Sequence, residues 1–318
     1  SIIHQLAPSA ELWSAKVYRA SKVGANVVPY QPTVDIVAQA LEWALDPDGD
    51  GDTSDKADII LLDISGFGPG YYSNQDVWIG DYARLGVNIQ KAATLGSVVI
   101  VPQGSGEQLS HYATPIQAVA PAAISVGTTQ SIEDDSAIYM SSTSLHGPVR
   151  GDIDAIKPDL VDSTDAVQVA LVGTGSEQAS ASDAVFAAAK VAAAAAVVKS
   201  ENSALTGQEV KAILMNSANS NVLNRDGSEQ AEVTHSGAGK LQQAEALKNT
   251  AVAFSLPDGQ PSLHLGNLDI ADNETRTVTE QVYVKNLTDK AITYDLSITQ
   301  KTGGPSHAAL TWQLPSSV

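Results

Sequence analysis

The segment DYARLGVNIQKAATLGSVVIV, residues 81–101, contains a helix pattern followed directly by a strand pattern. Residues 81–95 favour a helix, and Gly96 follows as a helix stop because glycine readily adopts the left-handed conformation. Residues 97–101 are apolar without polar alternation, which is typical of a strand buried on both faces. A helix that leads into such a strand indicates a parallel α/β sheet.

The same alternation extends toward the N-terminus. Residues 33–45 place their apolar side chains on one stripe, which predicts a helix that starts after Pro32. We expect buried strands at residues 11–18 and 57–63. Toward the C-terminus, the patterns predict three shorter strands and two helices, at residues 122–128, 137–140, 167–171, 184–199 and 206–219.

A second, all-β region is expected after the α/β region. From about Val252 the pattern changes to short alternating runs separated by turn residues, which predicts a small antiparallel sandwich. The runs are residues 263–268, 277–284, 292–299 and 310–314. We therefore divide the chain into an α/β domain at residues 1–250, with helices on both faces of its sheet, and a β domain with an incomplete set of strands at residues 251–318.

The composition of the chain argues against several classes of function. With 318 residues, 43% of them hydrophobic, the chain can bury a large core. Its 36 acidic and 18 basic residues give a net charge of −18, which repels nucleic acids and anionic membranes and also serves plain solubility. The absence of cysteine excludes disulfides and thiolate zinc sites. No apolar run approaches the roughly 18 residues that span a bilayer, so we expect neither a nucleic-acid partner nor a membrane span.

Short motifs in a fixed order resemble the subtilisin-like serine proteases, or subtilases. They are APSAEL at residues 7–12, AVAPAAISVG at 118–127, KPDL at 157–160, TGQEVKAILMNSA at 206–218 and GAG at 237–239. The resemblance covers roughly residues 6–250, and the tail resembles the fibronectin-III-like domain of large secreted subtilases. This resemblance implies a subtilisin-like fold and an extracellular or cell-surface location.

The resemblance also implies which positions would carry catalysis. A subtilase uses a serine nucleophile, a histidine base, an aspartate that orients the histidine, and an asparagine that binds the oxyanion. The stretch SDAVFAAAKVAA, residues 182–193, aligns with the nucleophile helix and puts Val185 at the serine position. Valine has no hydroxyl and cannot attack a carbonyl. Ser182 is the nearest hydroxyl, and Ser182 or Asp183 is expected to cap the helix.

Two further segments depart from the family pattern. The oxyanion segment PQGSG has Gly104 where the family has asparagine, although the amide of Gln103 fits if the register shifts by one. The substrate-binding strand ends in Asp63, Ser65 and Gly66, which we interpret as the remnant of a groove. Asp63 fits equally well as a solvated residue at a strand end. No catalytic residue is therefore predicted.

The aspartate and histidine of the family precede the APSAEL motif, and only six residues precede it here. We therefore expect an upstream part. In the family, the strand with the aspartate lies between the strands expected at residues 11–18 and 57–63. Because unpaired strand edges are costly, we expect an upstream fragment of the same precursor, or a partner protein, to fill this slot by strand addition. The alternative is that the two flanking strands pair directly.

The stretch DPDGDGDTSD, residues 46–55, is the best sequence signal for a ligand. Its alternating carboxylates can converge on one hard cation while Gly51 permits the turn. The closing glutamate of an EF-hand is absent, so the sequence predicts an isolated calcium loop; a solvated acidic turn is the alternative. The candidate ligands are Asp46, Asp48, Asp50, Asp52 and Asp55.

Together these observations predict an inactive subtilisin-like pseudoprotease that acts as a secreted binding, structural or assembly module, with self-assembly as one form of partnership. The alternative is a fragment of a serine endopeptidase whose aspartate and histidine lie on another segment.

Overall fold

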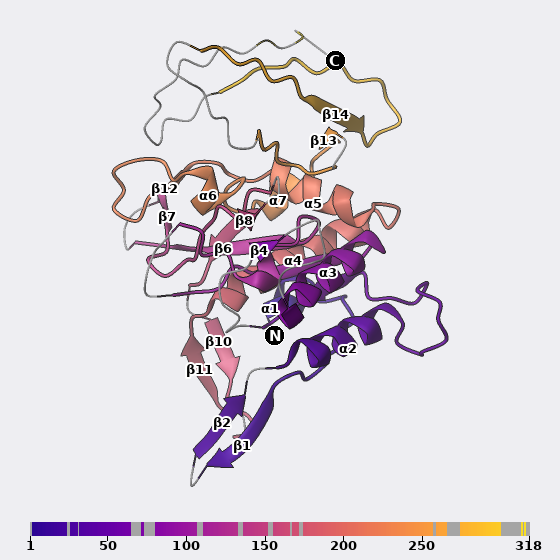
Figure 1. The fold of residues 1–318 in the computed structure, drawn as a ribbon, viewed down its shortest axis with the longest axis vertical. Helices are drawn as coiled ribbons and strands as arrows, with labels where there is room; N and C mark the ends of the chain where they lie inside the picture. Colours follow the sequence, from indigo (N-terminus) through magenta and orange to yellow (C-terminus); the bar gives the residue numbers. More distant parts are fainter. Residues whose placement is uncertain are drawn as a thin grey trace.

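A central β-sheet forms the core of the region at residues 1–250 (Figure 1). The structure is a computed structural model, and it describes residues 2–23, 26–30, 32–64, 71–72, 80–106, 111–132, 136–151, 155–165, 167–171, 174–256, 259–265, 274–299, 313 and 315. Within these residues, six strands form one sheet in the order β12-β7-β6-β5-β3, with β9 also paired to β6. The strands are β3 (Ile59–Leu61), β5 (Val98–Pro102), β6 (Ile124–Gln130), β7 (Ile138–Met140), β9 (Leu160–Ser163) and β12 (Val222–Leu223).

Most ladders of this sheet are parallel, as the sequence predicts. β3 pairs with β5, β5 with β6, and β6 with β9, all in parallel. β7 pairs antiparallel with β6 and parallel with β12. The predicted α/β fold class with a mostly parallel sheet is therefore confirmed.

Successive residues of β5 supply two hydrophobic cores on opposite faces of the sheet, because side chains alternate along a strand. Val98 and Ile100 pack with α4 (Ala184–Glu201) and α5 (Gly207–Asn216). Val99 and Val101 belong to the other core, with α2 (Val34–Leu45) and α3 (Gly80–Thr94). The sheet thus has helices on both faces, as predicted.

Local capping is complete at α5 but not at α2. Thr33 is the N-cap residue of α2, and its side chain makes no hydrogen bond to the helix. At α5, the Thr206 hydroxyl accepts from the Glu209 amide while the Glu209 carboxylate accepts from the Thr206 amide, which is a complete capping box. Most residues of α4 are buried, because its many alanines have small side chains that allow the helix to approach the sheet closely. These three helices agree with the predicted ranges to within about three residues at each end, the usual uncertainty of helix boundaries.

The segment at residues 11–18 is not a strand, so that prediction is wrong. It leads instead into a hairpin of β1 (Arg19–Val23) and β2 (Asn26–Tyr30), which extends away from the sheet (Figure 1). The physical reason is that an isolated extended segment has no neighbouring backbone to satisfy its hydrogen bonds. The alternative in which residues 11–18 pair directly with residues 57–63 is likewise wrong, since β3 is the terminal strand of the described sheet.

A second hairpin also lies outside the sheet. β10 (Val167–Ala170) pairs antiparallel with β11 (Gln178–Ala181), just before α4. The strand predicted at residues 167–171 therefore exists, although its partner is local in sequence. Shorter elements are α1 (Ile2–Leu6), β4 (Tyr71–Tyr72), β8 (Arg150–Gly151), the 3₁₀ helix η1 (Ile116–Ala118), α6 (Val233–Ser236) and α7 (Gln243–Ala246).

The C-terminal region contains an antiparallel pair, β13 (Ala251–Leu256) and β14 (Gln281–Asn286), at the opposite end of the molecule from the β1–β2 hairpin (Figure 1). β13 packs on α5, and the Ala253 amide donates to Asn216 Oδ1 at 2.8 Å. Described residues of the 292–299 run are not in a strand, and the run at 310–314 lies almost entirely outside the described residues. The sandwich and the boundary at residue 250 remain predictions.

A buried ion group joins the KPDL motif to α5. Lys157 Nζ lies 2.6 Å from Asp159 Oδ2, and Lys211 Nζ lies 2.8 Å from Asp159 Oδ1, with the three side chains almost fully buried. Ser125 adds hydrogen bonds to Asp159 from its amide, at 2.7 Å, and from its hydroxyl, at 3.0 Å. The motif therefore ties β6, β9 and α5 into one unit.

In the part of the chain that the structure describes, no helix combines the length and apolar character needed to cross a bilayer.

Candidate functional site

The first turn of α4 is the centre of the site that the sequence predicts. Asp183 is the N-cap residue, and its carboxylate accepts from the Val185 amide at 3.0 Å. Ser182, the nearest hydroxyl, donates to the Thr164 carbonyl. Of the two predicted caps, Asp183 is therefore the one that the structure uses. The start of this helix already holds a negative charge, which the helix dipole favours there.

The predicted oxyanion segment lies at the end of β5. Gln103 is fully buried, and its Nε2 donates to the Thr114 hydroxyl at 3.0 Å. Gly104 has a φ of +87°, and its carbonyl accepts from the Leu145 amide at 3.4 Å. The only side chain here with an amide donor therefore has an internal partner, and Gly104 offers no side chain at all.

Asp63 follows β3 and faces the same region. Burial is the first reason that the pKa of its carboxyl is raised, and the negative charge of Asp183 is the second. The end of β3 and the start of α4 thus bring two acidic groups near each other, although they are 120 residues apart in sequence. Ser65 and Gly66 lie outside the described residues.

The acidic loop between α2 and β3 is a tight turn. Gly49 and Gly51 have φ values of +74° and +88°, which favour glycine. Carboxylate oxygens of Asp46, Asp48 and Asp50 lie within 4.8 Å of one another and could hold a cation.

The carboxylates of this loop also accept hydrogen bonds from its backbone. The Gly51 amide donates to Asp46 Oδ2 at 2.9 Å. Asp52, a predicted ligand, instead accepts from Ser54, at 3.0 Å to its amide and 3.0 Å to its hydroxyl. Asp55 is not part of the converging group. Three of the five predicted ligands thus come together, while calcium prefers six to eight oxygens.

A cavity of about 940 Å³ lies beside β3, at the edge of the sheet. Residues 59–64 form one wall and residues 10–18 form another. α2 and α4 contribute Leu41 and Ala192, and Trp43 contacts Trp13 with ring centroids 6.0 Å apart. The cavity lies between the two segments that were expected to flank a missing strand, and the filling of that position by another segment remains a prediction.

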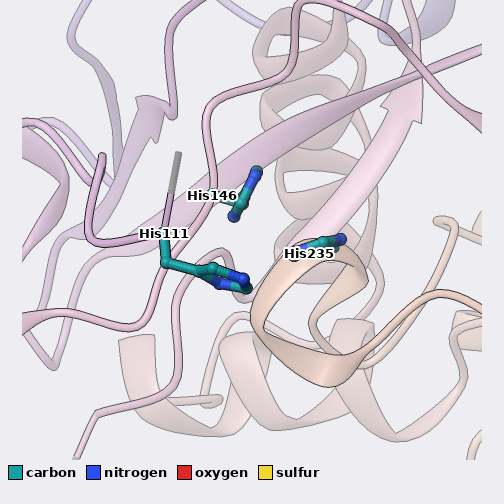
Figure 2. Close-up of side chains that lie close together, drawn as sticks. All are labelled: His111, His146 and His235. Atoms are coloured by element: carbon teal, nitrogen blue, oxygen red, sulfur yellow. The ribbon is translucent and has the colours of Figure 1, made fainter. Parts of the chain in front are cut away.

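Three histidines from separate segments converge (Figure 2). His111 and His146 lie on loops, and His235 lies on α6. Each can offer one ring nitrogen such that all three nitrogens lie within 4.8 Å of one another. Burial lowers the pKa of His235 to about 4, helped by the neighbouring His146, while Glu232 opposes this. Burial likewise lowers the pKa of His146.

The sequence analysis did not single out these histidines. They are 35 and 89 residues apart, and none of them belongs to a short metal-binding spacing. The only local signal is that two of them adjoin glycine-containing motifs, HGP at residues 146–148 and HSGAG at residues 235–239. Only the folded chain places them together.

One sequence profile and several solved protease structures are similar to this chain. The sequence profile described as "Subtilase family" matches residues 3–239. No curated protein matches the chain in sequence. Among solved structures, fervidolysin from Fervidobacterium pennivorans, a keratinolytic enzyme related to subtilisin, is similar with 16% identity and a TM-score of 0.49, over 70% of this chain and 31% of that one.

Two other solved structures are similar to the same extent. The prenylagaramide maturation protease PagA has 16% identity and a TM-score of 0.48, over 69% of this chain and 68% of its own. A protease of Pseudoalteromonas arctica PAMC 21717 has 18% identity and a TM-score of 0.48, over 68% of this chain and 59% of its own.

Proposed function

This chain belongs to the subtilase family, and we propose that within this family it is a pseudoprotease, a binding or structural module that does not cleave peptides. Subtilases are commonly secreted, and we propose that this member works outside the cell or at the cell surface. The observation that carries the proposal is the first turn of α4. Val185 has no hydroxyl, and Asp183 places a carboxylate on the amide of Val185.

Two electrostatic features add support. In subtilases, the start of the nucleophile helix helps to stabilise a negative oxyanion. Here Asp183 and Asp63 put negative charge at that helix start, and an oxyanion there would be repelled. Moreover, the one amide side chain of the oxyanion segment, Gln103, bonds to Thr114. Each of these changes is expected to slow acyl transfer, and together they support the proposal of an inactive scaffold.

A fluorophosphonate probe tests this proposal, because it labels only serines activated as nucleophiles. The chain should remain unlabelled under conditions that label an active subtilisin completely. Ser182→Ala is the matched variant, since Ser182 is the hydroxyl nearest to the predicted position. Labelling that disappears in Ser182→Ala would contradict the pseudoprotease and favour the alternative, an endopeptidase fragment completed by another segment.

We also propose that the free edge of β3 receives an added strand, either from an upstream fragment of the same precursor or from a partner protein. Residues of β3 and many apolar residues line the cavity at this edge, together with charged residues such as Lys16, Asp58 and Lys199. Strand addition uses an exposed strand edge with pockets for side chains beside it. Exposed Leu12 and Trp13 lie on its outer wall. Pairing of two copies through the same edge would produce self-assembly, the third form of partnership that the sequence suggests.

Calcium at the acidic loop is the remaining proposal. Asp46, Asp48 and Asp50 would supply three carboxylates, with backbone carbonyls and water completing the shell. The ion would neutralise part of the repulsion within the loop and hold the connection between α2 and β3, and hence one margin of the cavity.

A further inference from the structure

Three loops that are distant in sequence meet at the histidine cluster, defined as His111, His146 and His235 (Figure 2). The rings of His146 and His235 have centroids 3.8 Å apart, and His111 lies 5.3 Å and 5.7 Å from them. Packing alone can bring histidine rings this close to one another. Convergence of one nitrogen from each of three rings is the arrangement that a metal ion requires.

The backbone around the cluster is held by hydrogen bonds between the three segments. The Tyr112 amide donates to the Gly147 carbonyl at 3.1 Å, and the Ala113 amide donates to the His146 carbonyl at 3.0 Å. The Gly147 amide donates to the Thr234 carbonyl at 2.9 Å. Each bond lies within two residues of a clustered histidine. Backbone hydrogen bonds therefore join the three segments that carry these side chains.

Close packing fixes this framework further. A side chain at Gly147 would collide with the Lys157 carbonyl, so the loop can approach only because residue 147 is glycine. Tyr112, directly after His111, has a φ of +66°, a left-handed conformation that is unusual for an aromatic residue. Such strain persists where surrounding contacts over-determine the backbone. The positions of His111 and His146 are thus set by the fold.

The hydrogen bonds of the rings leave ligand atoms available. His235 Nε2 is buried, and no hydrogen-bond partner exists for it among the described residues. His146 is 7% exposed, and its Nδ1 lies 3.4 Å from the Gly147 carbonyl. A ring nitrogen that donates to a carbonyl leaves the other nitrogen as a metal ligand, which is the usual outer-shell arrangement of ligating histidines.

We propose that His111, His146 and His235 form a binding site for a divalent transition metal ion, with Zn²⁺ as the preferred occupant. Imidazole suits zinc, which takes three histidines and leaves a fourth position for water or a further ligand. His111 is exposed, so this fourth position opens to solvent. The nitrogens must move from within 4.8 Å to about 3.3 Å of one another, the edge of a tetrahedron with Zn–N bonds of about 2.0–2.1 Å.

The ion would link α6 to the loops at residues 111–113 and 146–147, and so hold three separate segments of the chain together. Glu232 precedes α6 and is close enough to affect the charge of His146 and His235, and its carboxylate offers negative charge to the bound cation. None of the three histidines belongs to α4. The existence of the site does not depend on whether the chain cleaves peptides.

Titration of metal-free protein with ZnCl₂ tests the site by calorimetry, and Co²⁺ absorption reports the coordination geometry. Wild-type protein should bind one Zn²⁺ per chain at this site. His111→Ala and His235→Asn should each weaken binding by more than about 100-fold, because loss of an outer-shell partner alone costs about 10–100-fold. His111 is exposed, so its variant should keep the thermal midpoint of the metal-free wild type.

Two matched variants separate this site from other metal ligands. His4→Ala removes an exposed histidine on α1, and Asp48→Asn alters the acidic loop; both should leave Zn²⁺ affinity unchanged. Zn²⁺ should raise the thermal midpoint of the wild type but not of His111→Ala. Absence of binding by the wild type, or binding that survives both His111→Ala and His235→Asn, would overturn the proposal.

Discussion

Asp159 illustrates how much a single side chain can carry in this fold. It bridges two lysine ammonium groups and accepts two hydrogen bonds from Ser125. Burial alone would raise the pKa of Asp159, but Lys157 and Lys211 outweigh burial and hold its pKa below the usual value. Burial also lowers the pKa of Lys157 to about 7, against the opposing charge of Asp159.

Asp159→Asn should therefore lower the free energy of unfolding by about 3–5 kcal/mol, because two buried lysines lose their counter-ion. Urea denaturation at pH 6, below the pKa of about 7 of Lys157, measures the loss. Asp35→Asn is the control, since the exposed Asp35–Arg84 pair is worth at most about 1 kcal/mol. Because the folded pKa of Asp159 is depressed, its contribution should be complete above about pH 4 and should decline as the pH falls further. Equal losses in both variants would contradict this role.

At the scale of elements, the acidic loop joins α2 to the strand that borders the cavity. Its carboxylates accept hydrogen bonds from its own amides, which stabilise the turn. Three carboxylates within 4.8 Å still repel one another. A bound cation would convert that repulsion into attraction.

Calcium should therefore stabilise the chain, by about 2.7 kcal/mol when free Ca²⁺ exceeds the dissociation constant 100-fold. Thermal unfolding with and without a chelator measures the effect. Asp48→Asn should abolish the calcium response, whereas Asp226→Asn, in an exposed turn elsewhere, should retain it. The proposal fails if chelation and Asp48→Asn both leave the unfolding midpoint where it was.

The comparison of sequence with structure is also clearest at this scale. α2, α4 and β5 were predictable because their patterns are local: an apolar stripe, an alanine run with a cap, and an apolar run after Gly96. The conformation of residues 11–18 was not predictable, because an extended segment becomes a strand only beside a partner. The sequence limited the N-cap residue of α4 to two candidates, Ser182 and Asp183, of which the structure has Asp183. The histidine cluster could not be predicted, since its members share no spacing and meet only through packing.

Within the described residues, the central sheet ends in β12 on one side and in β3 on the other. The C-terminal pair β13–β14 is attached through α5 and through the ion pair of Lys285 with Glu209. At the other end, β3 has β5 on one flank and the cavity on the other. The proposed strand addition belongs to this edge because the cavity lies beside it.

Hydrogen exchange measured by NMR tests whether the edge is open. The Leu62 amide donates to the Ile100 carbonyl at 2.9 Å and should exchange slowly. The Leu61 amide points the other way, because bonding alternates along a parallel strand, and should exchange faster by orders of magnitude. Dilute protein should show this contrast. Equal protection of both amides at every concentration would mean that the edge is already paired and that no slot exists.

The proposed strand addition at β3 would impose an order of events when the chain is made. Hydrogen-bond donors and acceptors at that edge can be taken by the intended strand or by the same edge of another copy. A strand tethered in the same precursor arrives at a rate that does not depend on how many chains are present, whereas encounter between copies rises with the square of their number. The level of synthesis would thus decide between the completed sheet and the mispaired one.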